Sequence, residues 1–328
     1  MSSNHVSVLG AGAFGTALAL AFARAGRDVM LWGRDAERMA ASAKTRQCGE
    51  ILPGLALEPR VTPTADLARA AKAPVIVIAV PAQALRQVAE ALASTITQGH
   101  AVISAAKGIE RRSGHFVTEV MADELGAQRF GVLSGPSFAA DIARGLPTAI
   151  SLAMADSNDA GVLAAHLGSP GFRIYHTTDM RGVEIGGAAK NVLAIAAGIV
   201  VGLGLGESAR AAIVTRGFAE LRRFAASLGA RPETLMGLSG LGDLLLTASS
   251  TQSRNFSLGL ALGQGKPLEQ ARGAKLAEGA FTAEALDDMA RARQIDMPIV
   301  AGVRAILDDK LGVKDAVSAL MARPFREE

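Results

Sequence analysis

The feature that most constrains this chain is a glycine-rich turn close to its start. Residues 10–15 read Gly-Ala-Gly-Ala-Phe-Gly, which places glycines at the spacing G-x-G-x-x-G. The apolar run at residues 6–9 before the turn is typical of a buried strand. The Ala-rich stretch from Phe14 to about Ala25 is typical of a helix, and Gly26 is suited to cap its C-terminus. A strand, a turn and a helix in this order predict the beginning of a βαβ unit.

Each glycine of the turn has its own physical use. Gly10 permits the sharp turn, Gly12 lets the backbone approach a pyrophosphate, and Gly15 lets helix and strand pack closely. The start of the helix directs N–H groups and the positive end of its dipole at the phosphates. A second predicted strand, residues 28–32, follows at the right distance. This context favours dinucleotide binding over a purely structural turn.

The residues after the second strand bear on the choice of cofactor. An acidic residue there would bind the adenosine 2′-hydroxyl, whereas an arginine can accommodate a 2′-phosphate. This chain has Arg34 first, and Asp35 is suited to cap the following helix. In the alternative interpretation, Arg34 is simply a surface residue. We expect NADP or NAD as the cofactor, with NADPH favoured.

Further strand and helix signals predict the fold class. Short apolar or β-branched runs separated by helical stretches occur at residues 75–80, 101–104, 130–133 and 148–154. From about Thr178 the strand signals end, and helical patterns continue from Glu184 to Leu320. We therefore expect an α/β, Rossmann-type domain at residues 1–180, with a mainly parallel sheet and helices on both faces. An all-helical domain should follow at residues 181–328.

Composition excludes several function classes. The 34 basic and 31 acidic residues are scattered, without a Lys/Arg block, so nucleic acid is not an expected partner. The single cysteine, Cys48, excludes an internal disulfide, and the five histidines lack metal-ligand spacing. The uncharged run at residues 192–205 is shorter than the roughly 20 residues that a bilayer requires. We expect no metal, no membrane insertion and, without a targeting segment, a cytoplasmic protein.

Lys190 is the strongest candidate for the chemistry. It lies in a predicted helix, residues 186–194, that contains almost nothing else polar. Burial disfavours a charged ammonium, so we expect a lowered pKa and a lysine able to exchange a proton with a carbonyl oxygen. The alternative is a lysine whose methylene chain carries the ammonium out to solvent.

Other polar residues stand where a ligand would need them. Lys107 follows the predicted strand at 101–104, and ligands of parallel sheets bind at that end of the strands. The turn at residues 134–137 offers N–H groups and a hydroxyl. Asp243 either orients Lys190 or caps a helix. Arg254 and Asn255 suit phosphate oxygens, unless they are solvated surface.

These segments together resemble the bacterial NAD(P)-dependent glycerol-3-phosphate dehydrogenases over nearly the whole chain. The segments that carry the resemblance are residues 10–18, 106–110, 133–139, 189–191, 240–244 and 253–255. The resemblance implies reduction of dihydroxyacetone phosphate to sn-glycerol 3-phosphate, which supplies phospholipid synthesis.

The resemblance also implies roles for individual residues. Lys190 would be the proton donor or acceptor, with Lys107 and Asp243 completing the polar centre. The residues implied to contact substrate are Lys107, Gly135, Ser137, Lys190, Asp243, Ser253, Arg254 and Asn255. Those implied to contact the cofactor, together with the turn glycines Gly10, Gly12 and Gly15, are Ala13, Phe14, Arg34, Lys107, Ala139, Arg254, Leu276 and Glu278.

The chain departs from the family pattern at two places. The family often has Asn-x-x-Tyr-Leu-Pro-Gly where residues 48–54 read Cys-Gly-Glu-Ile-Leu-Pro-Gly, so contacts from the Asn and Tyr are not carried over. Ala13 replaces a frequent hydroxyl or amide residue, and the turn therefore relies more on backbone donors.

Two other functions fit parts of the pattern. A reductase of the β-hydroxyacid or ketopantoate type would share the glycine turn and a helical lysine, but phosphate suits Arg254 and Asn255 better than a carboxylate alone. A non-catalytic dinucleotide sensor would keep the turn without needing Lys190. The Ala/Gly-rich helices around residues 198–206 suggest a homodimer, in which they would pack against a second copy.

Overall fold

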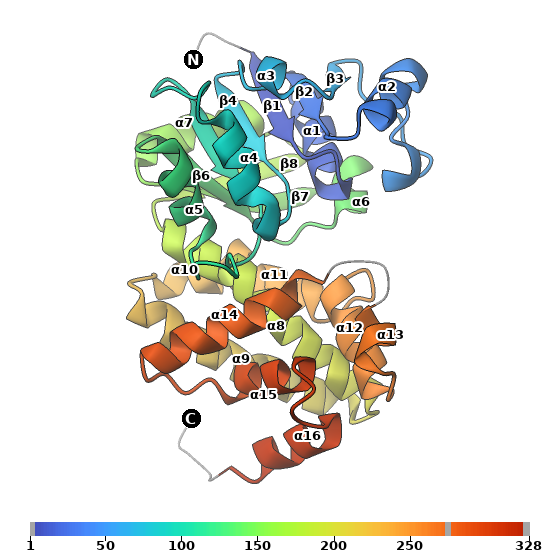
Figure 1. The fold of residues 1–328 in the computed structure, drawn as a ribbon, viewed down its shortest axis with the longest axis vertical. Coiled ribbons are helices and arrows are strands. Elements are labelled where there is room, and N and C mark those ends of the chain that lie inside the picture. Colours follow the sequence, from blue (N-terminus) through green and yellow to red (C-terminus); the bar gives the residue numbers. More distant parts are fainter. Residues whose placement is uncertain (1–3, 273–276, 324–328) are drawn as a thin grey trace. The chain divides into compact units, whose positions relative to one another are not determined.

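The computed structural model describes residues 4–272 and 277–323. The chain forms two compact units, shown in Figure 1. Unit 1 comprises Met1–Lys107 and His115–Glu184, and unit 2 comprises Gly108–Gly114 and Ile185–Glu328. The chain thus enters unit 2 briefly, directly after Lys107, and returns to unit 1 before it leaves for good at Ile185.

The described part of unit 1 is built on one eight-stranded sheet with the order β3-β2-β1-β4-β5-β6-β7-β8. Neighbouring strands are parallel except β6 and β7, which are antiparallel. The order reverses between β1 and β4, which is the position where doubly wound sheets bind ligands. The strands are β1 (His5–Leu9), β2 (Asp28–Trp32), β3 (Val61–Thr64), β4 (Val75–Ile78), β5 (Ala101–Ser104), β6 (Arg129–Ser134), β7 (Thr148–Met154) and β8 (Phe172–Thr177).

Helices cover both faces of this sheet, as predicted. In β4, Val75 and Val77 pack into one buried cluster while Ile76 and Ile78 pack into another, because successive side chains of a strand point to opposite faces. The first cluster includes residues of α1, α6 and α7, and the second includes residues of α4 and α5. The helices of this unit are α1 (Ala13–Arg24), α2 (Ala36–Thr45), α3 (Leu67–Ala70), α4 (Leu85–Leu92), α5 (Val117–Leu125), α6 (Ala139–Ala143) and α7 (Ser157–Leu167), with short 3₁₀ turns η1 (Gly49–Ile51) and η2 (Ala82–Ala84).

Six strands were predicted from the sequence, and the two that were not, β3 and β8, are the edges of the sheet. An edge strand needs no apolar run on both faces, so its sequence signal is weak. β3 contains Pro63, which is tolerated at an edge because proline has no N–H to donate. In β8 only Phe172 is fully buried; Arg173, Tyr175 and His176 are exposed, and Tyr175 is 53% exposed.

In unit 2 the described residues form helices joined by loops, as predicted for the second domain, and Gly108–Gly114 is not helical. Its elements are α8 (Met180–Gly202, whose first turns belong to unit 1), α9 (Gly206–Ser227), α10 (Pro232–Met236), the π-helix η3 (Leu238–Gly242), α11 (Asp243–Thr247), α12 (Arg254–Gly263), α13 (Leu268–Arg272), α14 (Glu278–Ala292), α15 (Pro298–Leu307) and α16 (Val313–Met321). Pro232 and Pro298 are the first residues of α10 and α15, where proline's missing N–H costs nothing.

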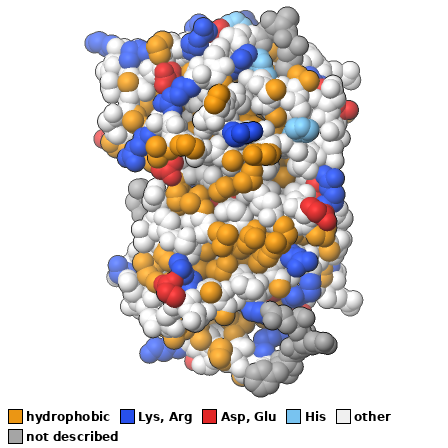
Figure 2. All heavy atoms as spheres, turned by 180° about the vertical axis from the view of Figure 1, so that it is seen from behind, with side chains coloured by type: hydrophobic (Ala, Val, Ile, Leu, Met, Phe, Trp, Pro, Cys, Tyr) orange, Lys and Arg blue, Asp and Glu red, His pale blue; other side chains and the backbone are white. Residues whose placement is uncertain are grey.

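Helix α8 is long and apolar enough to cross a membrane by length and composition, but 89% of its most apolar window is buried in the protein. Burial of this kind is expected of a core helix. On the face shown in Figure 2, Lys and Arg side chains are scattered among uncharged and acidic ones.

Glycines bring α8 and α12 into backbone contact. A Cβ atom on Gly198 would lie 2.1 Å from the carbonyl oxygen of Phe256, and one on Gly259 would lie 2.0 Å from that of Ile195. Gly202 and Gly263 repeat this relationship one turn further along each helix. The expectation that this part of α8 packs against a second copy is therefore wrong for Gly198 and Gly202, which pack within the chain.

Candidate functional site

The glycine turn joins β1 to α1 at the C-terminal edge of the sheet. The N–H of Gly10 donates a 2.9 Å hydrogen bond to the carbonyl of Trp32, and Gly10 has a φ of +121°. A Cβ atom there would lie 2.6 Å from the Ala79 carbonyl oxygen, and a Cβ atom on Gly15 would lie 1.9 Å from the carbonyl oxygen of Gly10. Packing of the protein itself therefore requires both glycines.

Gly12 differs from its two neighbours in the motif. It has ordinary extended backbone angles, and a Cβ atom added to it would meet no atom within 4 Å. Gly12 is the N-cap of α1, no side chain caps this helix, and its first turn contains no acidic residue. The space above Gly12 and the positive end of the α1 dipole fit a pyrophosphate well.

The residues after β2 separate into two roles. An oxygen of Asp35 accepts the N–H of Arg38 at 2.9 Å, so Asp35 is the N-cap of α2, as predicted. Arg34 is exposed. Because the Asp35 carboxylate is engaged at the helix end, the local structure lacks the free acidic group that would favour a 2′-hydroxyl at this position.

Lys107 lies three residues beyond the end of β5. Its Nζ atom donates a 3.0 Å hydrogen bond to the carbonyl of Gly135 and lies 5.6 Å from the ring centroid of Phe14. The Ser137 hydroxyl donates to the same carbonyl at 2.9 Å. Unit 1 therefore brings together four residues that the sequence analysis singled out at separate positions. Ala139 begins the short helix α6 directly after this turn.

Gly135 shapes the turn that carries these groups. Its φ is +153°, and a Cβ atom would lie 2.8 Å from the Cα of Ile150 in β7. A larger residue would push the end of β6 away from β7, so glycine is required by the backbone at this point.

In unit 2, Lys190 is buried, with 7% of its surface exposed. Its Nζ atom donates a 2.5 Å hydrogen bond to Oδ1 of Asp243 and a 2.9 Å hydrogen bond to Oγ1 of Thr247. Asp243 is 1% exposed, and no side chain caps α11, so Asp243 orients the lysine rather than capping the helix. Burial disfavours the ammonium form of Lys190, whereas the Asp243 carboxylate favours it. The sequence analysis considered burial alone and did not include this second effect.

A π-helix directly precedes Asp243, the partner of Lys190. Residues 238–242 form η3 immediately before Asp243, and π-helical turns are common at functional sites. A Cβ atom on Gly186 of α8 would lie 2.7 Å from the Ser239 carbonyl oxygen, so glycine allows α8 to approach η3 closely. This close approach supports the contact between Lys190, one turn further along α8, and the start of α11.

Thr247 was missed by the sequence analysis, although a signal was present. A residue four positions after Asp243 lies on the same face of a helix, so a hydroxyl there is placed to share the same partner. Asn191 was not singled out as a site residue either, although it lies in the segment 189–191 that carries the resemblance.

Asn191 belongs to a second polar cluster in unit 2. The Asn255 amide donates to Oδ1 of Asn191 at 2.9 Å, and the Asn255 oxygen accepts the N–H of Gly279 at 3.0 Å. Ser253 caps α12 by accepting the N–H of Phe256. Asn255 is thus held inside unit 2 and links α8, α12 and α14.

Two of the remaining predicted residues lie at the starts of helices. Arg254 is exposed at the start of α12, and Glu278 is the first residue of α14. Leu276 lies outside the described residues. In the part of the chain that the structure describes, no three His, Cys, Asp or Glu side chains are placed to hold a metal ion.

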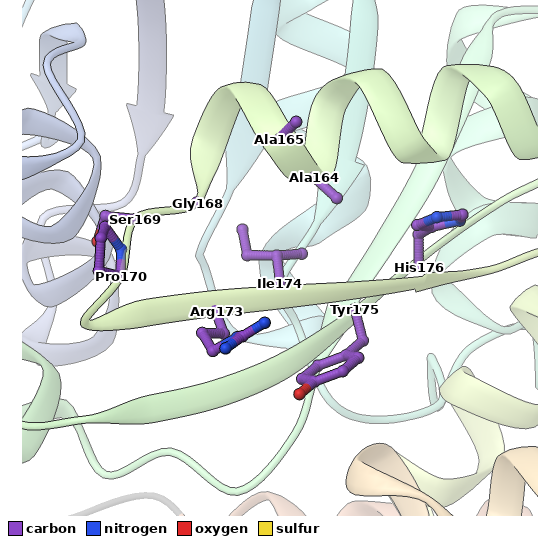
Figure 3. A pocket seen from close by; sticks show the side chains of 9 residues that line it. All are labelled: Ala164, Ala165, Gly168, Ser169, Pro170, Arg173, Ile174, Tyr175 and His176. Carbon is purple, nitrogen blue, oxygen red and sulfur yellow. The ribbon is translucent and has the colours of Figure 1, made fainter.

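An open groove elsewhere in unit 1 lies along β8, against α7. In Figure 3, Ile174 and His176 point from β8 to the side of α7, whereas Arg173 and Tyr175 point to the opposite side. None of the catalytic or binding residues predicted from the sequence lines this groove.

Comparison with known proteins relates both halves of the chain to one family. Residues 5–160 match the model described as NAD-dependent glycerol-3-phosphate dehydrogenase N-terminus, and residues 179–318 match the corresponding C-terminus model. A protein named glycerol-3-phosphate dehydrogenase [NAD(P)+] from Azorhizobium caulinodans is 57% identical, covering 99% of this chain and 98% of its own length. One of the same name from Bradyrhizobium diazoefficiens is 56% identical over the full length of both chains. The crystal structure of glycerol-3-phosphate dehydrogenase from Coxiella burnetii has a TM-score of 0.93 and 37% identity, covering 98% of this chain and 99% of that one.

Proposed function

Because this chain belongs to the NAD-dependent glycerol-3-phosphate dehydrogenase family, we propose that it interconverts dihydroxyacetone phosphate and sn-glycerol 3-phosphate. The protein is an oxidoreductase that uses NAD or NADP. The observation that carries the assignment of chemistry is the buried contact of Lys190 with Asp243 and Thr247. We assign cofactor binding to the domain at residues 1–180 and proton transfer to the domain at residues 181–328.

The reaction needs a hydride at the carbonyl carbon and a proton at the carbonyl oxygen. The nicotinamide of a bound cofactor would supply the hydride. Lys190 supplies the proton from Nζ in the reductive direction and takes it back in the oxidative direction. Asp243 favours the charged form of Lys190, which carries the proton to be donated, and Thr247 fixes the direction of the ammonium.

Binding of the substrate requires cations, because its phosphate is close to dianionic at neutral pH. Lys107 and Arg254 supply them in this proposal. The groups assigned to the rest of the substrate are Gly135, Ser137, Ser253 and Asn255. Lys107 is held by the Gly135 carbonyl, which supports a fixed position for its charge.

The cofactor is assigned to the glycine turn and its surroundings. Its pyrophosphate would lie above Gly12 at the start of α1, where the structure has room for it. The other residues assigned to the cofactor are Gly10, Ala13, Phe14, Gly15, Arg34, Lys107, Ala139, Arg254, Leu276 and Glu278. NADPH is the favoured form because Arg34, rather than a free carboxylate, follows β2.

We also propose a cytoplasmic location, in which the product supplies phospholipid synthesis, and a homodimeric state. The single cysteine supports a reducing compartment. The dimer surface has to lie away from Gly198 and Gly202, which pack against α12.

A coupled set of assays tests the proposed function. The purified protein should oxidise NADPH with dihydroxyacetone phosphate and remain inactive with ketopantoate. Lys190→Ala should lower turnover by about a hundredfold or more while NADPH binding stays unchanged, because a general acid contributes on the order of 10²–10⁴. Lys266→Ala, which changes an exposed lysine of the same unit, is the matched control and should retain activity. Wild-type turnover in Lys190→Ala would disprove the role of Lys190. A wild-type protein that binds NADPH but has no turnover would fit a non-catalytic sensor.

A further inference from the structure

A second arginine lies close to Arg34, in the first turn of α2. Arg38 is the third residue of this helix, and helical side chains lean toward the N-terminus, which is the end where Arg34 lies. The segment is continuous with the glycine turn: Leu9 pairs with Trp32, and a Cβ atom on Gly33 would lie 2.9 Å from the Cβ of Ala11. Arg34 and Arg38 therefore border the part of unit 1 to which the cofactor is assigned.

Arg38 has an unusual environment for a charged side chain. It is half-buried, and its Nε atom is enclosed without any hydrogen-bond acceptor. Four other arginines of unit 1, Arg24, Arg60, Arg86 and Arg129, each pair with a carboxylate. Within the described residues, neither Arg34 nor Arg38 forms an ion pair. An enclosed donor without a partner is costly, and a guanidinium group that forms no ion pair is suited to bind an anion such as a phosphate.

Two carboxylates lie in the same segment, and neither neutralises the arginines. Asp35 accepts the backbone N–H of Arg38 at the helix end. Glu37 is exposed, and it pairs with neither arginine in the described structure. The two guanidinium groups are therefore available to an external anion, and a phosphate suits the planar fork of an arginine.

We propose that Arg38 is a specificity-determining residue that, together with Arg34, binds the 2′-phosphate of NADPH. The proposal rests on the proposed function, which places the adenosine part of the cofactor at the end of β2. The order of residues after β2 had suggested Arg34 as a ligand of this phosphate, and the proposal adds Arg38 as a second one. The half-buried position of Arg38 makes it the better oriented of the two, because Arg34 is exposed and less constrained.

Binding measurements on the full-length protein test this proposal. For Arg38→Met, which keeps much of the apolar stem and removes the charge, the affinity for NADPH should fall about ten- to a hundredfold, as for a lost charge-assisted hydrogen bond. The affinity for NADH should change by less than about twofold. The same contrast should appear between 2′,5′-ADP, which carries the phosphate, and 5′-ADP, which lacks it. Arg38→Lys should restore only part of the loss, because lysine cannot form a bidentate contact.

Control variants separate this effect from the general charge of the domain. Arg69→Met removes an exposed arginine beside the N-terminal ends of β1 and β2, whereas Arg34 and Arg38 follow the C-terminal end of β2. This variant should alter neither the affinity for NADPH nor that for NADH. Glu37→Gln removes a nearby negative charge and should leave NADPH binding unchanged or slightly tighter. A loss of NADPH affinity in Arg69→Met as large as in Arg38→Met would overturn the proposal.

The outcome for Arg38 is distinguishable from that for the proposed function. If the wild type reduces dihydroxyacetone phosphate but Arg38→Met keeps the wild-type ratio of NADPH to NADH affinity, the role of Arg38 is wrong and the proposed function stands. If the wild type binds 2′,5′-ADP through Arg38 but does not act on dihydroxyacetone phosphate, the proposed reaction is wrong and the phosphate site stands. Weakened binding of 2′,5′-ADP and 5′-ADP alike in Arg38→Met would show a structural role only.

Discussion

The Nζ atom of Lys190 lies 2.5 Å from Oδ1 of Asp243, 53 residues further along the chain, and both side chains are buried. In low-dielectric surroundings each charge depends on the other, because neither is stabilised by water. The pair therefore has two effects that mutation should separate: it fixes the position of the proposed proton-transfer group, and it offsets the cost of burying that group.

Removing one charge of this pair should harm both folding and activity. Lys190→Met removes the ammonium that lies 2.5 Å from the buried Asp243 carboxylate, and breaking a buried pair in this way costs about 3–5 kcal/mol of unfolding free energy. The double variant Lys190→Met/Asp243→Leu should recover most of that stability and still be inactive. Urea unfolding and NADPH oxidation measure the two effects. Recovered activity in the double variant would contradict the assigned role of Lys190.

Alanine substitutions in the glycine turn should affect binding at Gly12 and stability at Gly15. Gly12→Ala should change the unfolding free energy by less than about 1 kcal/mol, since its Cβ meets no protein atom, but it should weaken NADPH binding. Gly15→Ala should destabilise the protein by about 1–3 kcal/mol or more, because its Cβ would lie 1.9 Å from a backbone oxygen. Chemical denaturation with a parallel NADPH titration checks both. Unchanged NADPH affinity in Gly12→Ala would argue against a pyrophosphate at this position.

Stability should decrease as the pH rises from 4.5 to about 7. Burial raises the pKa of both Glu184 and Glu220 from 4.5 to about 7, against the hydrogen bonds that Thr118 and Ile299 donate to their carboxylates. In this pH range the two glutamates lose their protons in the unfolded chain but keep them in the native state. The free energy of unfolding therefore falls as the pH rises, by at most about 3 kcal/mol for each glutamate.

The variant Glu220→Gln tests this pH dependence without removing the acceptor that faces α15. Its unfolding free energy, measured at pH 4.5, 5.5, 6.5 and 7.5 (roughly spanning the two pKa values), should decline about half as steeply as that of the wild type. Equal slopes in the two proteins would show that Glu220 titrates near its ordinary value in the folded state.

Two glycine-to-alanine changes in helices of unit 2 should differ in sign. In Gly198→Ala the new methyl group would meet the Phe256 carbonyl oxygen at 2.1 Å, so α8 and α12 must separate, at a cost of about 1–3 kcal/mol or more. Gly302 of α15 has no atom within 4 Å of its Cβ position, and Gly302→Ala should stabilise the protein by about 0.5–1 kcal/mol. Thermal unfolding of the two variants compares them directly. A stabilised Gly198→Ala would mean that the two helices are not in close contact.

Local signals predicted much of the fold. Strands β2, β5 and β7 begin and end at the predicted residues, because each interior strand is an apolar or β-branched run bounded by turn residues. The Asp35 cap of α2 is likewise a contact between residues three apart. The edge strands β3 and β8 were not predicted, because a strand that pairs on one side only does not need a continuous apolar sequence.

By itself, the sequence determined the class of fold, the glycine turn to which we assign the cofactor, and which lysines and acids were candidates for chemistry, since all of these depend on residue types within a few positions of one another. Only the tertiary structure decided that Asp243 faces Lys190 rather than capping its own helix, that Thr247 joins them, and that Gly198 meets α12 instead of a second copy. Those outcomes depend on which distant helices touch, and long-range packing is set by the fit of whole surfaces rather than by the spacing of residues along the chain.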